Sequence, residues 1–264
     1  MNTVVCIKAV PSTTEVKMDP VTNTLVRDGR QSVVNPFDQT ALEVAVRLKE
    51  QLGGRVCALS MGIPDTERLL RDCLARGADQ GLLLSDRAFA GADTLATSYS
   101  LSCGLADLTK NGWHTDLVIC GKMAVDGDTA QIGPELACVL GVPCVTDVLE
   151  VVAADEQELA LRRATDAGEA IVRVDLPCVI TVAKDVCTPR MPSISGVRWS
   201  CEGPVEVRNA QAVDADPARI GLAGSPTQVV RSFTPERSGG CTPVEGDASQ
   251  QAAKLAEMFE EMGL

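Results

Sequence analysis

Few side chains in this sequence have the type and spacing that catalysis requires. Among the 264 residues there is one histidine, His114, which excludes metal sites built from several histidines and leaves at most one imidazole base. The eleven cysteines include no C-x-x-C pair, so zinc-ribbon, thioredoxin-type and iron–sulfur patterns are absent. The spacing of the remaining polar residues gives no catalytic triad and no carboxylate dyad. We therefore predict no catalytic side chain and no metal site.

The strongest candidate for a binding site is the segment of residues 116–141, which reads DLVICGKMAVDGDTAQIGPELACVLG. Its apolar start predicts a buried strand that ends at Gly121, and a loop of small residues leads to a helix expected to begin near Asp128. The first N–H groups of a helix are unpaired and bind phosphate, and Gly127 lets the backbone approach a ligand. Neutral hydrogen-bonding groups in the same loop are Thr129 and Gln131. The segment therefore predicts a phosphate-binding loop.

A purely structural interpretation of this loop fits its residues equally well. Asp126-Gly127 is a common turn pair, and Asp128 is an ordinary helix N-cap. The loop has neither the G-x-G-x-x-G nor the G-x-x-x-x-G-K-[ST] spacing, so neither of those phosphate motifs applies. A capping role would account for the Asp128 carboxylate close to a phosphate, whereas the residues alone give no role to Asp126.

The overall charge limits the classes of partner. The chain has 36 acidic and 24 basic residues and a formal net charge of −12, which argues against nucleic acid as the main partner. A bound phosphate would have to be held by local backbone donors against this negative field. No apolar stretch approaches the ~20 residues of a membrane span, and the N-terminal residues do not read as a signal peptide. We expect a cytoplasmic protein without a membrane span.

Alternating strands and helices would position this loop. Short runs rich in Val, Ile and Leu predict buried strands at residues 4–10, 55–60, 81–85 and 116–121. Helical patterns between these runs cover residues 36–52, 64–76 and 92–110. The alternation predicts an α/β fold with a mostly parallel, doubly wound sheet built from right-handed βαβ units.

Ligands of such sheets bind in the crevice beyond the carboxyl ends of the strands, and several other short features would meet there. They are Lys8-Ala9 after the first strand, Met61-Gly62 after the second, and Asn35-Pro36 at the start of the first long helix. Each of these features alone is more often structural than functional. If the sheet is parallel, all of them converge on one crevice together with Gly121.

The second part of the chain has a different organisation. Residues 144–184 read as four strands, which we interpret as antiparallel additions to the parallel sheet. Residues 190–246 are punctuated by Pro and Gly and show little core-forming periodicity, so they are either disordered or ordered against another surface. Residues 248–262 predict an amphipathic helix. We therefore divide the chain into an α/β core, residues 1–189, and an extended C-terminal arm with a terminal helix, residues 190–264.

Five sequence motifs resemble those of the β subunit of electron-transfer flavoproteins. They are VVCIKAVPSTTEVKMDP, VVNPFDQTALEVAVRLKE, ALSMG, ICGKMAVDGDTAQIGPELA and RMPSISG, in the family's order over most of residues 1–200. The resemblance implies an α/β domain whose C-terminal arm wraps around an α subunit, and an adenine nucleotide in the crevice at the strand ends. The binding residues that it implies are Ala9, Asn35, Met61, Gly121, Lys122, Ala124, Asp126, Gly127, Asp128, Thr129, Ala130 and Gln131.

The family that these motifs resemble has two branches with different cofactors. Housekeeping members hold AMP in the β subunit, carry one FAD on the α subunit and accept electrons from acyl-CoA dehydrogenases. The bifurcating branch holds a second FAD in the β subunit and takes a hydride from NADH. It sends one electron to ferredoxin or flavodoxin and the other to the α-subunit FAD, for delivery to an acyl-CoA dehydrogenase-type partner. The stretch AVDGDTAQIGP resembles the bifurcating branch, because the small residues Gly127, Thr129 and Ala130 leave room for a whole FAD.

Residues 184–199 resemble the partner-recognition loop of the same family. Met191 falls where the family places an apolar anchor for the dehydrogenase, next to Pro192 and Ile194, and an exposed, flexible Met suits a surface that meets several partners. A plain Pro-rich connector is the alternative interpretation of this segment. For the whole chain, the AMP-binding branch stays open, as does a nucleotide-binding sensor of the universal-stress-protein type. Such sensors are compact, so the predicted arm argues against the sensor.

Overall fold

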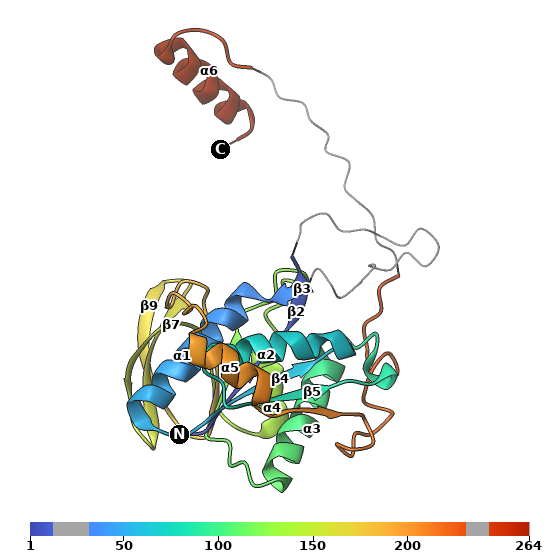
Figure 1. Ribbon diagram of the computed structural model, residues 1–264. Coiled ribbons are helices and arrows are strands. Elements are labelled where there is room, and N and C mark those ends of the chain that lie inside the picture. Colours follow the sequence, from blue (N-terminus) through green and yellow to red (C-terminus); the bar gives the residue numbers. More distant parts are fainter. Residues whose placement is uncertain (13–31, 231–242, 264) are drawn as a thin grey trace. The chain divides into compact units, whose positions relative to one another are not determined.

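The computed structural model describes residues 1–12, 32–230 and 243–263 and divides the chain into two compact units. The first unit is Met1–Val229 and the second is Val230–Leu264 (Figure 1). Cys241 and residues 13–20 of the first sequence motif lie outside the described residues. The sheet, the helices that cover it and both candidate binding regions belong to the first unit.

A nine-stranded sheet forms the centre of the first unit, in the order β11-β5-β4-β1-β6-β10-β7-β8-β9. In that order the strands are Val205–Arg208, Gln80–Leu84, Val56–Met61, Thr3–Cys6, Leu117–Gly121, Cys178–Val182, Cys144–Ala154, Glu158–Thr165 and Gly168–Asp175. Neighbouring strands are parallel from β11 to β7, whereas β8 pairs antiparallel with both β7 and β9. A separate antiparallel pair consists of β2 (Ala9–Pro11) and β3 (Ser32–Val34). The predicted mostly parallel α/β sheet with antiparallel additions is confirmed.

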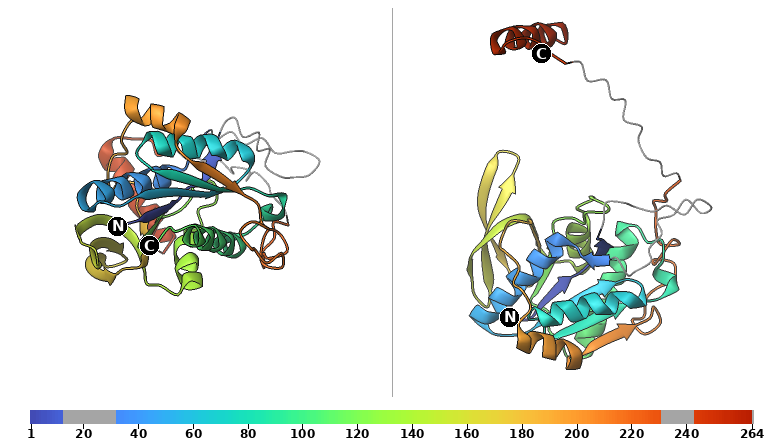
Figure 2. Two further views of the ribbon diagram at one scale, coloured as in Figure 1. Left: turned by 60° about the horizontal axis from the view of Figure 1, so that its bottom comes forward. Right: turned by 45° about the horizontal axis from the view of Figure 1, so that its top comes forward.

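Helices cover both faces of this sheet, as a doubly wound fold requires (Figure 2). The four covering helices are α1 (Pro36–Leu52), α2 (Glu67–Ala75), α3 (Thr94–Lys110) and α4 (Ile132–Leu140), and short 3-10 turns precede α2 and α3 at Pro64–Thr66 and Arg87–Phe89. Buried side chains of α1 and α2 join one hydrophobic cluster, and those of α3 and α4 join a second cluster on the other face. A further helix, α5 (Ile194–Glu202), packs against α2.

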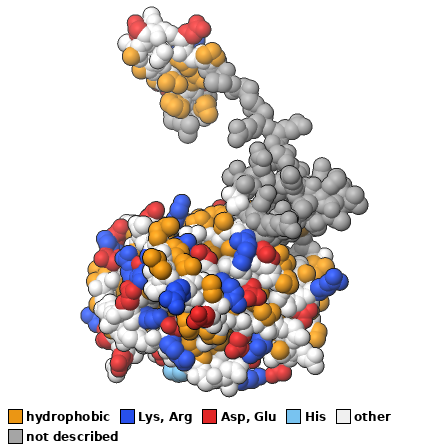
Figure 3. Space-filling view, in the orientation of Figure 1, with side chains coloured by type: hydrophobic (Ala, Val, Ile, Leu, Met, Phe, Trp, Pro, Cys, Tyr) orange, Lys and Arg blue, Asp and Glu red, His pale blue; other side chains and the backbone are white. Residues whose placement is uncertain are grey.

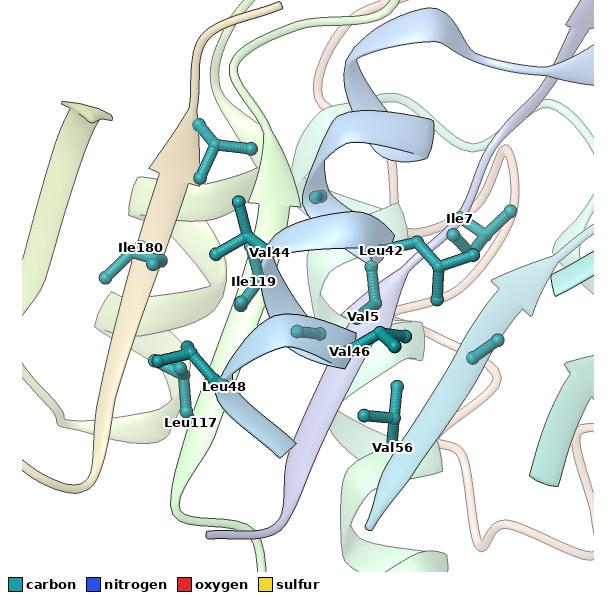
Figure 4. Close-up of a cluster of buried hydrophobic side chains, with 14 of the residues drawn as sticks. Val5, Ile7, Leu42, Val44, Val46, Leu48, Val56, Leu117, Ile119 and Ile180 are labelled. Carbon is teal, nitrogen blue, oxygen red and sulfur yellow. The ribbon is translucent and has the colours of Figure 1, made fainter. Parts of the chain in front are cut away.

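Helix α1 is the element that links the sheet to the predicted crevice, and its sequence explains its bounds. Pro36 occupies the first helical position, where a missing N–H leaves no hydrogen bond unmade, and the helix stops at Gly53, which has φ 75°. On its inner face Leu42 packs into one buried cluster with Val5 of β1 and Ile119 of β6 (Figure 4). Each fully buried Val, Leu or Ile contributes roughly 1.5–3 kcal/mol relative to an exposed one. This burial holds the first turn of α1 beside the carboxyl ends of β1 and β6.

The structure corrects the prediction for β10, the last strand of the run that was expected to be antiparallel. It lies between β6 and β7 and is parallel to both, so it is a central strand of the sheet and not an added edge. All five residues of β10, CVITV, are buried. A continuous apolar strand of this kind is typical of the middle of a parallel sheet, where both faces are covered by helices.

Residues 190–229 are ordered within the first unit, although the sequence assigned them to the arm. α5 packs on α2, and β11 pairs with β5 as the edge strand of the sheet. Farther along, the guanidinium of Arg219 stacks 3.8 Å from the centre of the Tyr99 ring. The boundary between the units therefore falls after Val229 rather than after residue 189. These elements are short, and their contacts come from distant parts of the chain, so the local pattern does not reveal them.

The second unit contains one described helix, α6 (Ala248–Glu261), where the sequence predicts one. Asp247 and Gln250 form a reciprocal capping box at its start, which satisfies two otherwise unpaired backbone N–H groups. Apolar side chains of α6 lie together on its surface (Figure 3). The exposed large ones are Leu255, Met258, Phe259 and Met262.

Candidate functional site

The carboxyl ends of β1 and β6 form the point at which the order of the strands reverses. From β1 the chain proceeds through α1 to β4 and through α2 to β5, and it then returns through α3 to β6 on the other side of β1. Ligands of open α/β sheets bind in the crevice at such a point. The predicted residues Ala9, Met61 and Gly121 all lie at this edge, because they follow or end β1, β4 and β6.

A buried carboxylate, Asp38, joins the elements that border the crevice. Asp38 lies in the first turn of α1 and is 6% exposed. Its Oδ2 accepts a hydrogen bond from the backbone N–H of Lys8 (2.8 Å), and its Oδ1 accepts one from the backbone N–H of Gly121 (3.2 Å). Lys8 and Gly121 follow and end the two central strands, so one side chain fixes the start of α1 against both strand ends.

Asn35 extends this network into the loop that follows β6. It stands at the N-cap position of α1, as predicted, but its side chain forms no cap hydrogen bond. Its Nδ2 instead donates to Asp38 Oδ1 (3.0 Å) and to the carbonyl of Met123 (2.9 Å), and its Oδ1 accepts from the N–H of Val125 (3.3 Å). Asn35 is 1% exposed. It therefore positions the first part of the predicted binding loop.

Burial raises the pKa of the Asp38 carboxyl from its ordinary value of 3.8 to about 7. The hydrogen bonds from Lys8, Asn35 and Gly121, and the ammonium charge of Lys8, act in the opposite direction but do not outweigh desolvation. Sequence reasoning missed this residue. The signal was present, because Asp38 precedes Ala41 and Leu42 by three and four positions and so lies on the apolar stripe of α1.

Two lysines of this region form ion pairs with carboxylates, and one of the pairs involves Asp126, to which the residues alone gave no role. Lys8 Nζ lies 2.6 Å from Asp126 Oδ1, which gives Asp126 a cationic partner within the loop region. Lys122 Nζ lies 2.5 Å from Asp147 Oδ1, and the backbone N–H of Lys122 donates to Val182 of β10 (2.8 Å). Asp126 and Asp147 therefore each lie beside a lysine of the same region, whereas the exposed Asp128 forms no ion pair among the described residues.

The loop itself differs from the prediction at its helical end. α4 begins at Ile132 with Gln131 at the N-cap position, so the expectation of a helix that starts near Asp128 and is capped by it is wrong. Asp128 and Ala130 have φ values of 54° and 55°, and this left-handed backbone cannot begin a right-handed helix. In the described part of the chain no acceptor meets the backbone N–H of Thr129. The neighbouring N–H groups of Ala130 and Gln131 are likewise unpaired there.

Gly127 provides open space at the centre of this loop. Among the described residues, a Cβ added there would meet one atom within 4 Å, Lys8 Nζ at 3.8 Å, whereas a Cβ on Gly121 would lie 2.3 Å from Asp38 Oδ1. The residues from Val125 to Gln131 are exposed. An exposed loop in which left-handed residues alternate with others, and whose backbone N–H groups have no acceptor, is the kind of concave site that binds anions. The loop is thus open around Gly127 and closely packed at Gly121, where it meets the sheet.

Other chemistries are not represented among the described residues. No group of three or more His, Cys, Asp or Glu side chains there could hold a metal ion. The ten described cysteines are free thiols, and six of them are buried. His114 is 83% exposed on the surface and lies 3.3 Å from Asp116. Within the same residues no helix is long and apolar enough to cross a membrane.

Comparison with known proteins decides the family. The model of the electron transfer flavoprotein domain matches residues 22–213. The chain belongs to the electron transfer flavoprotein family. It is 42% identical over 261 residues to the electron transfer flavoprotein subunit beta of Clostridium acetobutylicum, covering 99% of this chain and 98% of that protein.

Two further relatives of this flavoprotein family cover almost the whole chain. The caffeyl-CoA reductase-Etf complex subunit CarD of Acetobacterium woodii is 42% identical over 254 residues, 96% of this chain and 95% of that protein. Protein FixA of Azotobacter vinelandii is 39% identical over 267 residues, 98% of this chain and 95% of that protein. The resemblance to flavoprotein β subunits seen in the sequence is confirmed. Membership implies electron transfer, a flavin or nucleotide, and a second kind of subunit.

The predicted recognition residues of this flavoprotein subunit do not lie at the crevice. Met191 and Ile194 are 81% and 87% exposed, and Pro192 is half-buried. Met191 lines a cleft of about 400 Å³ together with Trp199 and the turn of residues 75–79. That turn precedes β5, so this cleft lies at the amino edge of the sheet, opposite the crevice. The structure thus separates the two sets of predicted binding residues by the full length of the strands.

Proposed function

We propose that this chain is the β subunit of a heterodimeric, electron-bifurcating electron transfer flavoprotein with FAD in the crevice at β1 and β6. FAD held there would supply the redox chemistry, accepting a hydride from NADH and passing one electron to ferredoxin or flavodoxin and one to the FAD of the α subunit. The protein contributes position and electrostatics. The observation that carries the proposal is the open loop around Gly127, where a Cβ would meet, of the residues that the structure describes, only Lys8, at 3.8 Å from its Nζ.

The donors of the loop suit the phosphates of a dinucleotide. The N–H groups of Thr129, Ala130 and Gln131 are exposed and have no acceptor among the described residues. Part of the opposing charge at such a phosphate is offset, since Asp126 is paired with Lys8 and Asp38 accepts three hydrogen bonds, while the exposed Asp128 forms no ion pair among the described residues. Local donors therefore favour an anion although the chain as a whole is acidic.

The remaining members of the proposed binding set have supporting roles. Asn35 positions the loop through Met123 and Val125, and Gly121 permits the close contact with Asp38. The complete proposed set is Ala9, Asn35, Met61, Gly121, Lys122, Ala124, Asp126, Gly127, Asp128, Thr129, Ala130 and Gln131. In this proposal no side chain acts as an acid or base, in keeping with a single, exposed histidine.

Two partner surfaces follow from the same proposal. The arm that ends in α6 would wrap around the α subunit, and the exposed Leu255 and Phe259 of α6 suit an apolar contact. Met191, Pro192 and Ile194 would dock an acyl-CoA dehydrogenase-type partner. One relative, CarD, is named as a subunit of a caffeyl-CoA reductase-Etf complex. We place the assembly in the cytoplasm.

Flavin counting on the co-purified heterodimer tests the proposal. Two FAD per heterodimer, both bleached by NADH, would support bifurcation. One FAD with one AMP would assign the chain to the housekeeping branch, and a heterodimer without any nucleotide on this subunit would overturn the crevice as the site.

A matched pair of variants tests the position of the site. Gly127→Leu should lose the nucleotide of this subunit and retain the α-subunit FAD, because the new side chain fills the open loop. Ala167→Leu, in the exposed turn between β8 and β9, should retain both. If Gly127→Leu also retains both, the site lies elsewhere.

A further inference from the structure

One arginine attaches the loop that carries Met191 to helix α1. Arg190 Nε lies 2.8 Å from Glu43 Oε2, and its two terminal nitrogens contact Glu50 at 2.5 and 2.9 Å. A terminal nitrogen also lies 3.2 Å from Glu43 Oε1, and the backbone N–H of Arg190 donates to Glu43 Oε2 (3.1 Å). The guanidinium thus bridges two carboxylates that lie two turns apart on one helix.

The inner carboxylate of this clamp is buried, so its pairing is energetically important. Glu43 is 4% exposed. Burial would raise the pKa of Glu43, but hydrogen bonds from Arg190 and Arg47 outweigh burial and lower it. Charge-assisted, two-pronged arginine–carboxylate contacts are roughly twice as strong as neutral hydrogen bonds and fix geometry as well as energy. Arg190 is therefore held in one orientation.

Backbone contacts on either side complete the attachment. Arg76, directly after α2, donates to the carbonyl of Arg190 (2.8 Å), and Arg71 of α2 donates to the carbonyl of Ser200 in α5 (2.9 Å). Thr40 of α1 donates through its hydroxyl to the carbonyl of Lys184 (2.9 Å). The main chain before and after Met191 is thus tied to two helices of the core.

The side chains that this attached segment presents are apolar and unburied. Met191, Ile194, Val197 and Trp199 are 81%, 87%, 50% and 42% exposed. The cleft beside them is lined by Leu74 as well as by Met191 and Trp199. The arginines around it are paired with carboxylates, Arg71 with Glu67, Arg76 with Asp72 and Arg190 with Glu43. The surface is therefore largely apolar, and the arginines that attach it to the core are neutralised, whereas the exposed Arg198 of α5 forms no ion pair among the described residues.

We propose that Arg190 is a positioning residue for docking, which holds the backbone of residues 187–203 on α1 so that Met191 and Ile194 are presented in a fixed place. This rests on the proposed docking role of Met191. The partner that it fits is a protein with an apolar recess, because the presented side chains are apolar and the arginines that attach the segment to the core are already paired. Fixing a loop before binding removes an ordering cost that would otherwise weaken the complex.

Hydrogen exchange on the heterodimer tests the attachment without any partner. In the Arg190→Met variant, the backbone amides of residues 187–203 should exchange about tenfold faster than in wild type. Arg198 is an exposed arginine on the same segment, and Arg198→Met should leave their exchange unchanged. Glu50→Gln removes the exposed half of the clamp and leaves no buried charge unpaired, so it should give a smaller increase. Unchanged exchange in both Arg190→Met and Glu50→Gln would overturn the proposal.

A binding measurement tests the effect of Arg190 on docking. It uses a purified acyl-CoA dehydrogenase that exchanges electrons with the wild-type heterodimer. Arg190→Met should raise the Kd about tenfold, Arg190→Lys should raise it less because it keeps the charge and loses the fork, and Arg198→Met should leave it unchanged. FAD content should be the same in all variants. Met191→Ala separates the two proposals. If it weakens binding and Arg190→Met does not, the positioning role is wrong; if neither weakens binding, the docking role of the loop is wrong as well.

Discussion

Asp38 and Glu43 are two buried carboxyl groups on the same helix, and their surroundings differ in kind. Asp38, 6% exposed, is met by the N–H groups of Lys8, Gly121 and Asn35. Glu43, 4% exposed, is met by the guanidinium groups of Arg47 and Arg190. Burial raises the pKa of Asp38 to about 7, whereas the two guanidinium partners outweigh burial and lower the pKa of Glu43.

The difference shows how α1 serves both edges of the sheet. At the carboxyl edge, a buried carboxyl group with a raised pKa joins the ends of β1 and β6 beside the proposed anion site. Toward the amino edge a fully ionised carboxylate holds a guanidinium, and with it a loop. Neutral donors suit the proposed ligand site, and a charged clamp suits the proposed docking segment.

The largest expected effect comes from crowding Asp38. In Gly121→Ala the new Cβ would lie 2.3 Å from Asp38 Oδ1 and 2.6 Å from Phe37 Cβ, so the start of α1 must move away from β6. Overpacking of this kind costs about 3 kcal/mol of unfolding free energy at the upper end of its usual range. Urea unfolding of the chain measures the loss, and the nucleotide content of the heterodimer should fall with it.

A glycine in the same loop provides the control for Gly121→Ala. In Gly127→Ala the Cβ has open space, so the unfolding free energy should stay within about 0.5 kcal/mol of wild type. Equal stability of the two variants would show that the contact between Asp38 and Gly121 does not hold the crevice together.

Much of the fold was predictable because its signals are local. Pro36 and the Gly53-Gly54 stop bracket α1, and the predicted and observed bounds agree. The apolar runs of the parallel strands agree with the sheet to within a few residues, except that the first run divides between β1 and β2. The convergence of Asn35 and Gly121 on one edge follows from the parallel order alone.

The remainder depended on contacts that no local pattern contains. Asp128 looks like a helix cap, but its φ of 54° is set by the loop that Asn35 ties to α1. Asp38 looks like an ordinary first-turn acid, and only the positions of Lys8 and Gly121 reveal its role. Arg190 looks like a connector residue until Glu43 and Glu50 are placed beside it.

The two carboxyls should give opposite dependences of stability on pH. Asp38 has a pKa raised from 3.8 to about 7, so the folded state keeps a proton that the unfolded state has already lost, and stability falls as the pH rises toward 7. Between pH 5.5 and 7.5 this contribution amounts to about 2 kcal/mol. Asp38→Asn should remove that slope, as measured by urea unfolding at several pH values.

Glu43→Gln sharpens the same measurement. The pKa of Glu43 is lowered, so its contribution is complete above the ordinary pKa of 4.5 and is lost only as the pH falls through the folded value. The variant should therefore lie about 1–2 kcal/mol below wild type and keep the same slope between pH 5.5 and 7.5. A loss of slope in Glu43→Gln, or its retention in Asp38→Asn, would contradict the assignment of the two groups.

The smallest expected effect on stability comes from replacing Lys8, whose backbone N–H donates a hydrogen bond to Asp38. Its side chain is 44% exposed and pairs with Asp126 at 2.6 Å, so Lys8→Gln should change the unfolding free energy by less than about 1 kcal/mol. Lys110, 61% exposed and 2.6 Å from Asp214, is a matched pair on a different part of the surface, and Lys110→Gln should behave alike in unfolding.

The two lysine variants should separate when a nucleotide is present. Without Lys8 the charge of Asp126 is no longer offset beside the loop, and AMP titrated into heterodimer stripped of its β-subunit nucleotide should bind about fivefold more weakly, ~1 kcal/mol. The difference from wild type should shrink between 50 and 500 mM salt, because exposed charges are screened over a shorter distance. Lys110→Gln should bind AMP as wild type does. If both variants weaken AMP binding equally, the effect comes from net charge and not from the pairing of Asp126, and the crevice is not kept neutral by Lys8.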